Sequence, residues 1–394
     1  MGIIQTKQVN VNIERLTDGD GHQFYGYYDN PAWSGNDRFH LYHKVKFWDR
    51  LQEAGDTAEL GMIDIATKRY VPLAETAAWN FQQGAMLQWH PLAPDSEIIF
   101  NTRSGGQWHG AVMNVHTKER RLLDRPVVNV DPAGRYALSV NFARMFDFRP
   151  GYGYAGIRDP FYDDPHPEQD GIFRIELATG RSELVVSLQR IWELTKGAFN
   201  GADRKIMINH LNFNTDGTRF IALVRNFPVA AGWKTAIVTA NCDGSELFLL
   251  SDFSYASHYH WKDPERLVIY SNGAAGSNAG NQLYVLTDRT HRVELVDPAF
   301  FRKDGHCSYS PDRSMLLYDS YPDEDGYRHL YVYDLVHKKG ALLGSFYSNP
   351  KANGDFRCDL HPKWNRAGTA ISFDSTHEGQ RHMYMADMRD VFNS

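Results

Sequence analysis

Short polar turns followed by runs rich in apolar, β-forming residues recur along the whole chain. One clear copy is "SPDRSMLLYDS" at residues 310–320, in which a Ser-Pro-Asp-Arg turn precedes the run "MLLYDS". A turn of this kind next to a β-rich run predicts a hairpin. Similar units, seven in all with this one, begin at Asn30, His90, Asp131, Asn214, Lys262 and His361.

The spacing of these units predicts a repeat fold. Asp216 and Asp263 are 47 residues apart, and Asp263 and Asp312 are 49 residues apart. A period of about 40–50 residues with four short strands per unit is typical of a β-propeller. The sequence therefore predicts an all-β, seven-bladed β-propeller that occupies residues 1–394 as a single domain. A β-sandwich with coincidental turns is the alternative, but it gives no reason for seven similar units.

The two ends of the chain predict how the ring closes. The last unit stops after its third strand, with only "RDVFNS" remaining, whereas "KQVNVNIERL" near the N-terminus alternates polar and apolar residues. A strand from the N-terminus can pair with the last blade and remove its exposed edge. We therefore expect an N-terminal strand to complete the last blade.

One interval between units is much longer than the others. Asp131 and Asn214 are 83 residues apart, and the excess includes residues 141–171, which are rich in Pro, Gly, Tyr and Asp. Residues 188–201 have the pattern of a short helix. Long loops on a rigid scaffold often carry function. This loop holds Arg144, Arg149, Tyr152, Tyr154 and Arg158, residue types that suit a carboxylated sugar. A loop folded on its own aromatic residues is the alternative.

Composition narrows the possible partners. The 394 residues carry a net charge of −6 and no basic run, so nucleic acid is not an expected partner. No apolar run approaches the length of a membrane helix, so no membrane contact is expected. The N-terminal residues lack the pattern of a signal peptide, which leaves a cytoplasmic or a processed secreted protein open. We expect a monomer. The 13% of aromatic residues suits strands and sugar binding.

Histidines recur where the innermost strand of each unit is expected to begin. The chain has 17 of them. Those at the expected strand entrances are His22, His90, His210, His258, His260, His306 and His361. In a propeller these entrances surround one central funnel, so their side chains should converge. The alternative is that each histidine only bonds a nearby loop backbone.

Two cysteines occupy matching points of adjacent units. Aligning "HCSYSP" with "RCDLHP" on the proline places Cys307 opposite Cys358, and "SHYHW" places His258 at the same point one unit earlier. With His361, or else His260 or His306, as the fourth ligand, these residues predict a structural zinc site that ties blades together. The alternative is that both cysteines are buried as small apolar residues. An odd total of three cysteines argues against a disulfide framework.

Six motifs in order resemble a known group of enzymes. They are "GHQFYGYYDNPAWS", "RPGYGY", "NHLNFNTDGTRF", "SHYHW", "DGHCSYSPD" and "RCDLHPKWNRAGTAISFDSTHEG". Together, from Gly21 to Met388, the chain resembles the seven-bladed β-propeller polysaccharide lyases: ulvan lyases, L-rhamnose-α-1,4-D-glucuronate lyases and, more remotely, oligogalacturonate lyases. The resemblance implies β-elimination at a uronic acid of an acidic polysaccharide or oligosaccharide. A cation neutralises the carboxylate, a base removes the C5 proton, and an acid protonates the O4 leaving group.

The resemblance also implies site residues. By position in the motifs, the catalytic set is His90, His109, Tyr154 and Arg174. Tyr152 remains an alternative to Tyr154, and Arg144 and Arg225 remain alternatives to Arg174. The residues expected to bind substrate are Arg144, Tyr152, Arg225 and His210.

A metal ion gives a second way to neutralise the carboxylate. In oligogalacturonate lyases, which are the remote part of the resemblance, a metal held by His and Gln does this. Here His306, Asp359 and His361 can hold such an ion, Ca or Mn, although the matching Gln pattern is absent.

Other classes of function leave weaker traces. A non-catalytic propeller that binds a carbohydrate or a protein partner is the main alternative to a lyase. A propeller peptidase would need a hydrolase domain with a nucleophile elbow, and the sequence contains no GxSxG motif.

Overall fold

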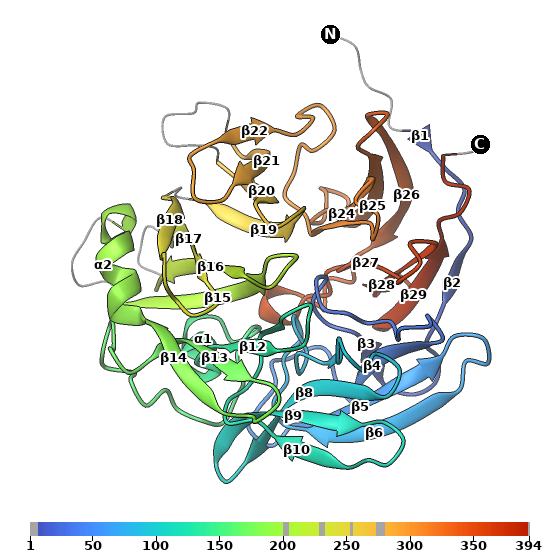
Figure 1. Ribbon diagram of the computed structural model, residues 1–394. Coiled ribbons are helices and arrows are strands. Elements are labelled where there is room, and N and C mark those ends of the chain that lie inside the picture. Colours follow the sequence, from blue (N-terminus) through green and yellow to red (C-terminus); the bar gives the residue numbers. More distant parts are fainter. Residues whose placement is uncertain (1–6, 200–204, 228–232, 253–254, 273–279, 393–394) are drawn as a thin grey trace.

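The strands form seven sheets that repeat around one axis. The computed structural model describes residues 7–199, 205–227, 233–252, 255–272 and 280–392. Figure 1 shows the sheets arranged as a ring. This confirms the predicted all-β, seven-bladed β-propeller. Among the described residues, no helix is long and apolar enough to cross a membrane.

The first five blades are antiparallel sheets whose four strands follow one another in the chain. The first blade contains β3 (His22–Phe24), β4 (Phe39–Val45), β5 (Ala58–Asp64) and β6 (Tyr70–Thr76). The second contains β7 (Gln88–Trp89), β8 (Glu97–Ser104), β9 (Gln107–Asn114) and β10 (Arg120–Leu122). The third contains β11 (Asn129–Val130), β12 (Tyr136–Ser139), β13 (Gly171–Glu176) and β14 (Ser182–Ser187).

The fourth and fifth blades repeat this order. The fourth contains β15 (Ile206–Phe213), β16 (Arg219–Asn226), β17 (Thr235–Asn241) and β18 (Phe248–Ser251). The fifth contains β19 (Ala256–Trp261), β20 (Arg266–Ser271), β21 (Gln282–Thr287) and β22 (Val293–Leu295).

The last two blades take strands from both ends of the chain. The sixth contains β23 (Cys307–Tyr309), β24 (Met315–Asp319), β25 (Tyr327–Asp334) and β26 (Lys339–Tyr347). The seventh contains β27 (Lys363–Trp364), β28 (Ala370–Ser375) and β29 (His382–Asp387). The strand β2 (Ile13–Arg15) completes the seventh blade by pairing antiparallel with β29, as predicted. The strand β1 (Lys7–Gln8) adds a parallel fifth strand to the sixth blade, which the sequence did not predict.

The core lies between adjacent blades. Alternate residues of each strand point to opposite faces of its sheet, so each blade offers an apolar face to both neighbours. Leu317, Leu330 and Val332 of the sixth blade, for example, share one buried cluster with Ile371 and Phe373 of the seventh. The rigid ring leaves the strand ends and loops free to form sites.

The innermost strands give the ring two distinct faces. Residues at or beyond the ends of all seven of these strands line one cavity, so the strands run in the same direction along the axis. We call the face where they end the lower face and the face where they begin the upper face. The long loop of the third blade connects its second and third strands and contains α1 (Phe142–Phe148). The predicted helix after the third blade is α2 (Leu188–Phe199), and η1 (Gly354–Phe356) precedes the seventh blade.

Candidate active site on the axis

The two histidines expected to act together in catalysis lie at opposite ends of the second blade. His90 follows β7 directly and donates its backbone N–H to the Glu97 carbonyl oxygen. His109 pairs with Thr102, which like Glu97 lies on β8. Thr102 is five residues beyond Glu97, a distance of about 17 Å at roughly 3.3 Å per residue. His90 therefore lies at the lower face, and not at a strand entrance as the sequence analysis assumed.

The other two expected catalytic residues are also held elsewhere. The Tyr154 ring is fully buried and stacks on Phe142 at 4.2 Å, and its hydroxyl accepts a hydrogen bond from the Asn101 amide at 2.9 Å. Arg174 forms an ion pair with Glu183 on the neighbouring strand β14. The structure thus gives His90, His109, Tyr154 and Arg174 four separate environments and does not bring them together.

The expected zinc ligands are not gathered either. Cys307 packs in an apolar cluster with Tyr318, and the Cys358 thiol donates to the Asp359 carbonyl oxygen at 3.8 Å. In the part of the chain that the structure describes, one group of His, Cys, Asp or Glu side chains can hold a metal, and it consists of His306, Asp359 and His361. This is the set that the sequence analysis named as the second possibility.

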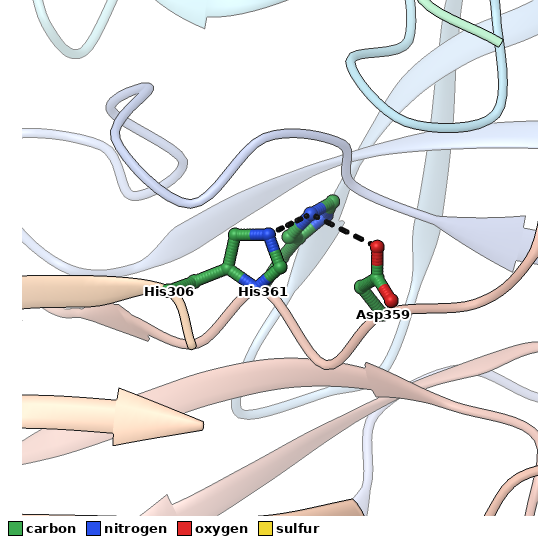
Figure 2. A group of neighbouring side chains, drawn as sticks. All are labelled: His306, Asp359 and His361. Carbon is green, nitrogen blue, oxygen red and sulfur yellow. Dashed lines mark hydrogen bonds and ion pairs between the residues drawn. The ribbon is translucent and has the colours of Figure 1, made fainter. Parts of the chain in front are cut away.

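Two backbone segments bring this metal-capable group together at the start of the innermost strands (Figure 2). His306 directly precedes β23, and Asp359 and His361 precede β27. The Nε2 atoms of His306 and His361 are 3.1 Å apart, and Asp359 Oδ2 is 3.9 Å from His361 Nε2. His361 has a φ of 44°, a strained value that the surrounding contacts must hold.

A neighbouring carboxylate orients the first of these histidines. Asp319 accepts hydrogen bonds from His306 Nδ1 at 3.0 Å and from the backbone N–H groups of His306 and His361 at 2.7 and 3.2 Å. Because the Nδ1 proton faces Asp319, the lone pair of His306 Nε2 faces His361. A carboxylate behind a histidine in this way is typical of metal ligands.

The protonation states also suit a divalent ion. Burial and the adjacent His306 hold the pKa of His361 well below its usual range, so its ring is neutral. Burial alone would raise the pKa of the Asp359 carboxyl, but Arg357 and Arg328 at 2.8 and 2.7 Å hold it well below its usual range. Two imidazole nitrogens and one carboxylate are common ligands of zinc and manganese. The residues therefore fit a divalent metal.

Arginines and a tyrosine lie next to this group. Arg357 donates to the Tyr152 hydroxyl at 3.2 Å, and the Arg149 guanidinium lies 4.5 Å from the Tyr152 ring. Arg225, at the end of β16, is buried; its Nη2 donates to the Ala256 carbonyl oxygen at 3.4 Å, and its Nε has no hydrogen-bond partner within the described ranges. Burial, together with the charge of Arg149, lowers the pKa of Arg225. We call Arg149, Arg225, Arg357 and Tyr152 the arginine layer. Its concentration of positive charge suits an anionic group.

Of the four residues expected to bind substrate, three lie near this centre. Tyr152 and Arg225 belong to the layer just described, and His210 contacts the edge of the Tyr27 ring at 4.9 Å. Arg144 does not, because its guanidinium is buried inside the long loop and pairs with Asp159 at 3.2 Å.

The axis also holds acid-base groups. His258 Nδ1 lies 3.0 Å from Asp304, its Nε2 has no partner among the described residues, and its ring is 3.9 Å from that of His306. Tyr27 contacts the His361 ring at 5.1 Å, and its hydroxyl has no partner among the same residues.

Sequence reasoning missed Tyr27, Arg357 and Asp319. The motif "YGYYDN" and the arginine in "FRCDLHP" were visible signals for the first two, and nothing local marks Asp319.

No family model and no curated protein matches the sequence. The fold is similar to an oligogalacturonate lyase from Vibrio parahaemolyticus, with 12% identity, 98% of this chain and 99% of that chain covered, and a TM-score of 0.65. It is similar to an oligogalacturonate lyase in complex with manganese, with 15% identity, 98% of each chain covered and a TM-score of 0.66. It is also similar to the β-propeller domain of the Trilobed protease from Pyrococcus furiosus, with 10% identity, 92% of this chain and 96% of that chain covered, and a TM-score of 0.52. At these identities the likeness shows that the chain has the β-propeller fold that lyases and protease domains share.

Proposed function

We propose that this protein is a lyase that cleaves the glycosidic bond to a uronic acid by β-elimination and leaves an unsaturated uronate. One observation carries the proposal: the arginine layer, the metal-capable group, and a histidine and a tyrosine whose polar atoms have no partner among the described residues share one site on the axis. The similarity of the fold to two oligogalacturonate lyases supports it.

The arginine layer neutralises the substrate carboxylate. Among the residues that the structure describes, Arg225 Nε has no hydrogen-bond partner, and the Arg149 guanidinium over Tyr152 makes one long contact, to Asp355 at 3.4 Å, so both keep donors for a ligand. Two guanidinium groups can hold a carboxylate in a fixed orientation. His306, Asp359 and His361 would hold a divalent ion, for which we take Mn²⁺ as the first candidate, and the ion would supply further positive charge that makes the C5 proton more acidic.

The free His and Tyr atoms supply the proton transfers. His258 carries its proton on Nδ1 toward Asp304, which leaves the Nε2 lone pair available to accept the C5 proton. Burial raises the pKa of Tyr27 well above the ordinary tyrosine value of about 10, so its hydroxyl is protonated near neutral pH and can donate to the O4 leaving group. The C5–H and C4–O4 bonds break, the C4–C5 double bond forms, and one proton moves from C5 to His258 and another from Tyr27 to O4.

The ultraviolet absorbance of the new double bond tests the proposal. The purified protein with Mn²⁺ is incubated separately with oligogalacturonate, rhamnose–glucuronate oligomers and ulvan. We expect the absorbance to rise with one of these saccharides. The rate of this rise should be roughly 10²-fold lower, or lower still, in Tyr27→Phe and in His258→Ala. The exposed histidine variant His116→Ala is the matched control and should keep the wild-type rate.

Other outcomes separate the alternatives. Binding of a uronate saccharide with no rise in absorbance would support the non-catalytic carbohydrate-binding propeller instead. A rise that is equal in the wild type, Tyr27→Phe and His258→Ala would support a lyase but refute the assigned residues.

A further inference from the structure

The lower face contains a second site, separate from the candidate active site. A cavity of about 530 Å³ opens there on the axis, and residues of all seven blades line it. Its volume lies within the range of small-molecule sites. The side chain of Tyr28 lies between the two sites, because it lines the cavity while its ring lies 5.1 Å from that of His306.

The charged groups of this lower cavity are mostly positive. Lys363, Arg313 and Arg366 line it, and Asp29 is the one carboxylate among the lining residues. Asp29 is already bonded to His210 at 2.8 Å and to a neighbouring amide. The protein as a whole has a net charge of −6, so this concentration of cations is local.

None of the three cations forms an ion pair with a carboxylate in the described part of the chain, and each instead donates to backbone carbonyl oxygens. Arg313 Nη1 donates to Trp261 at 3.4 Å, and Arg366 Nε donates to Trp33 at 3.1 Å. The Lys363 ammonium donates to two carbonyl oxygens, at 3.2 and 2.5 Å. A guanidinium has five N–H groups, so both arginines keep donors for a ligand. Lys363 is buried and Arg313 is partly buried, so low-dielectric walls strengthen their attraction for an anion, whereas Arg366 is exposed.

Neutral polar side chains also line the cavity. Asn30, Gln88, Asn212 and Ser308 are among them. Amide and hydroxyl groups of this kind can bond a ligand that carries several hydroxyl groups. The partly exposed Trp364 adds an aromatic surface of the kind that stacks on sugar rings.

We propose that the lower cavity binds a small carboxylated saccharide of one or two residues, with Arg313 and Arg366 holding the carboxylate. Three cations that form no ion pair with a carboxylate among the described residues select an anion, and the neutral polar side chains together with the tryptophan surface select a polyhydroxylated ring over a simple inorganic anion. This site does not depend on the proposed lyase activity, because it lies at the opposite face and shares no catalytic group with it.

Calorimetry with digalacturonate tests the lower cavity. The Arg225→Gln variant serves as the starting protein, because it lacks an anion-binding group of the upper face. We expect the affinity to fall about a hundredfold when Arg313→Gln and Arg366→Gln are added. The control pair Arg69→Gln and Arg120→Gln, both exposed, should leave it unchanged. Arg313→Lys with Arg366→Lys should retain most of the binding, which excludes a loss of folding as the cause.

Three results would overturn the proposal. The first is equal affinity with and without the two glutamine substitutions. The second is equal affinity for neutral galactobiose, which would remove the role of charge. The third is inorganic phosphate binding as tightly as digalacturonate, which would remove the role of the sugar ring. A lack of lyase activity in the wild type would leave each of these measurements interpretable.

Discussion

Arg144 holds the long loop of the third blade in place, and replacing it tests that role. Its guanidinium pairs with Asp159 at 3.2 Å, and only 2% of the residue is exposed. It also donates to the carbonyl oxygens of Ile206, Phe161, Asp164 and Pro165, at 2.8, 3.3, 3.1 and 2.7 Å. Five bonds from one buried side chain thus join both halves of the loop to the fourth blade.

The loss of stability in Arg144→Met depends on the groups that stay buried when the guanidinium is removed. Arg144→Met keeps an apolar stem but leaves Asp159 as a buried carboxylate without its charged partner. Breaking a buried ion pair in this way costs about 3–5 kcal/mol. We therefore expect Arg144→Met to lower the free energy of unfolding by about 3–5 kcal/mol, measured by urea titration with tryptophan fluorescence.

A second arginine of the same loop is the control. Arg158 lies 3.9 Å from Asp163, and both side chains are largely exposed. Arg158→Met should change the free energy of unfolding by less than about 0.5 kcal/mol. If Arg144→Met left the stability at the wild-type value but abolished saccharide binding, the structural role would be refuted and the substrate contact expected from the sequence would stand.

The remaining predictions concern the site, the core and pH. Asp319→Asn should weaken Mn²⁺ binding about 10–100-fold by calorimetry, whereas Asp323→Asn, at a partly buried His–Asp pair outside the metal-capable group, should not. Tyr154→Phe should keep the wild-type turnover and cost about 1 kcal/mol in urea unfolding, since it loses one hydrogen bond. Burial lowers the pKa of His40 and of His43 to about 3, below the ordinary value of 6.5, so the unfolded chain binds more protons between these values. The stability that these neutral histidines contribute is complete above about pH 6.5. Below that pH, the free energy of unfolding falls by about 1.4 kcal/mol per pH unit for each histidine. If the pH dependence of the free energy of unfolding were the same in His40→Gln as in the wild type, this prediction would be contradicted.

The fold could be predicted because its signals are local and repeated. A turn such as the one at Ser310, where the Arg313 N–H donates to the Ser310 carbonyl oxygen, forms within four residues and recurs with each blade. The closing strand β2 was predictable for a different reason, since an unpaired edge in the last blade required a partner. The parallel strand β1 was not, because the sixth blade already had four strands.

The face on which a residue lies was harder to predict, because the innermost strands are very short. The strand β7 has two residues, so His90 just after it reaches the lower face. The strand β27 also has two residues, yet His361 lies two positions before it, at the upper face. An error of three or four positions in a strand start therefore moves a side chain from one site to the other, and the "HP" motif is the same in both places.

The choice between two tyrosines depended on partners that are distant in sequence. Tyr152 and Tyr154 are two positions apart in "GYGY", with the same local environment. Gly153 between them approaches the α1 backbone so closely that a Cβ would lie 2.2 Å from the Phe146 nitrogen, and this contact fixes the path of the loop. On that path Tyr154 turns into the core, while Tyr152 meets Arg357, 205 residues further along the chain. Local sequence cannot encode that meeting, because only ring closure brings the third and seventh blades together at the axis.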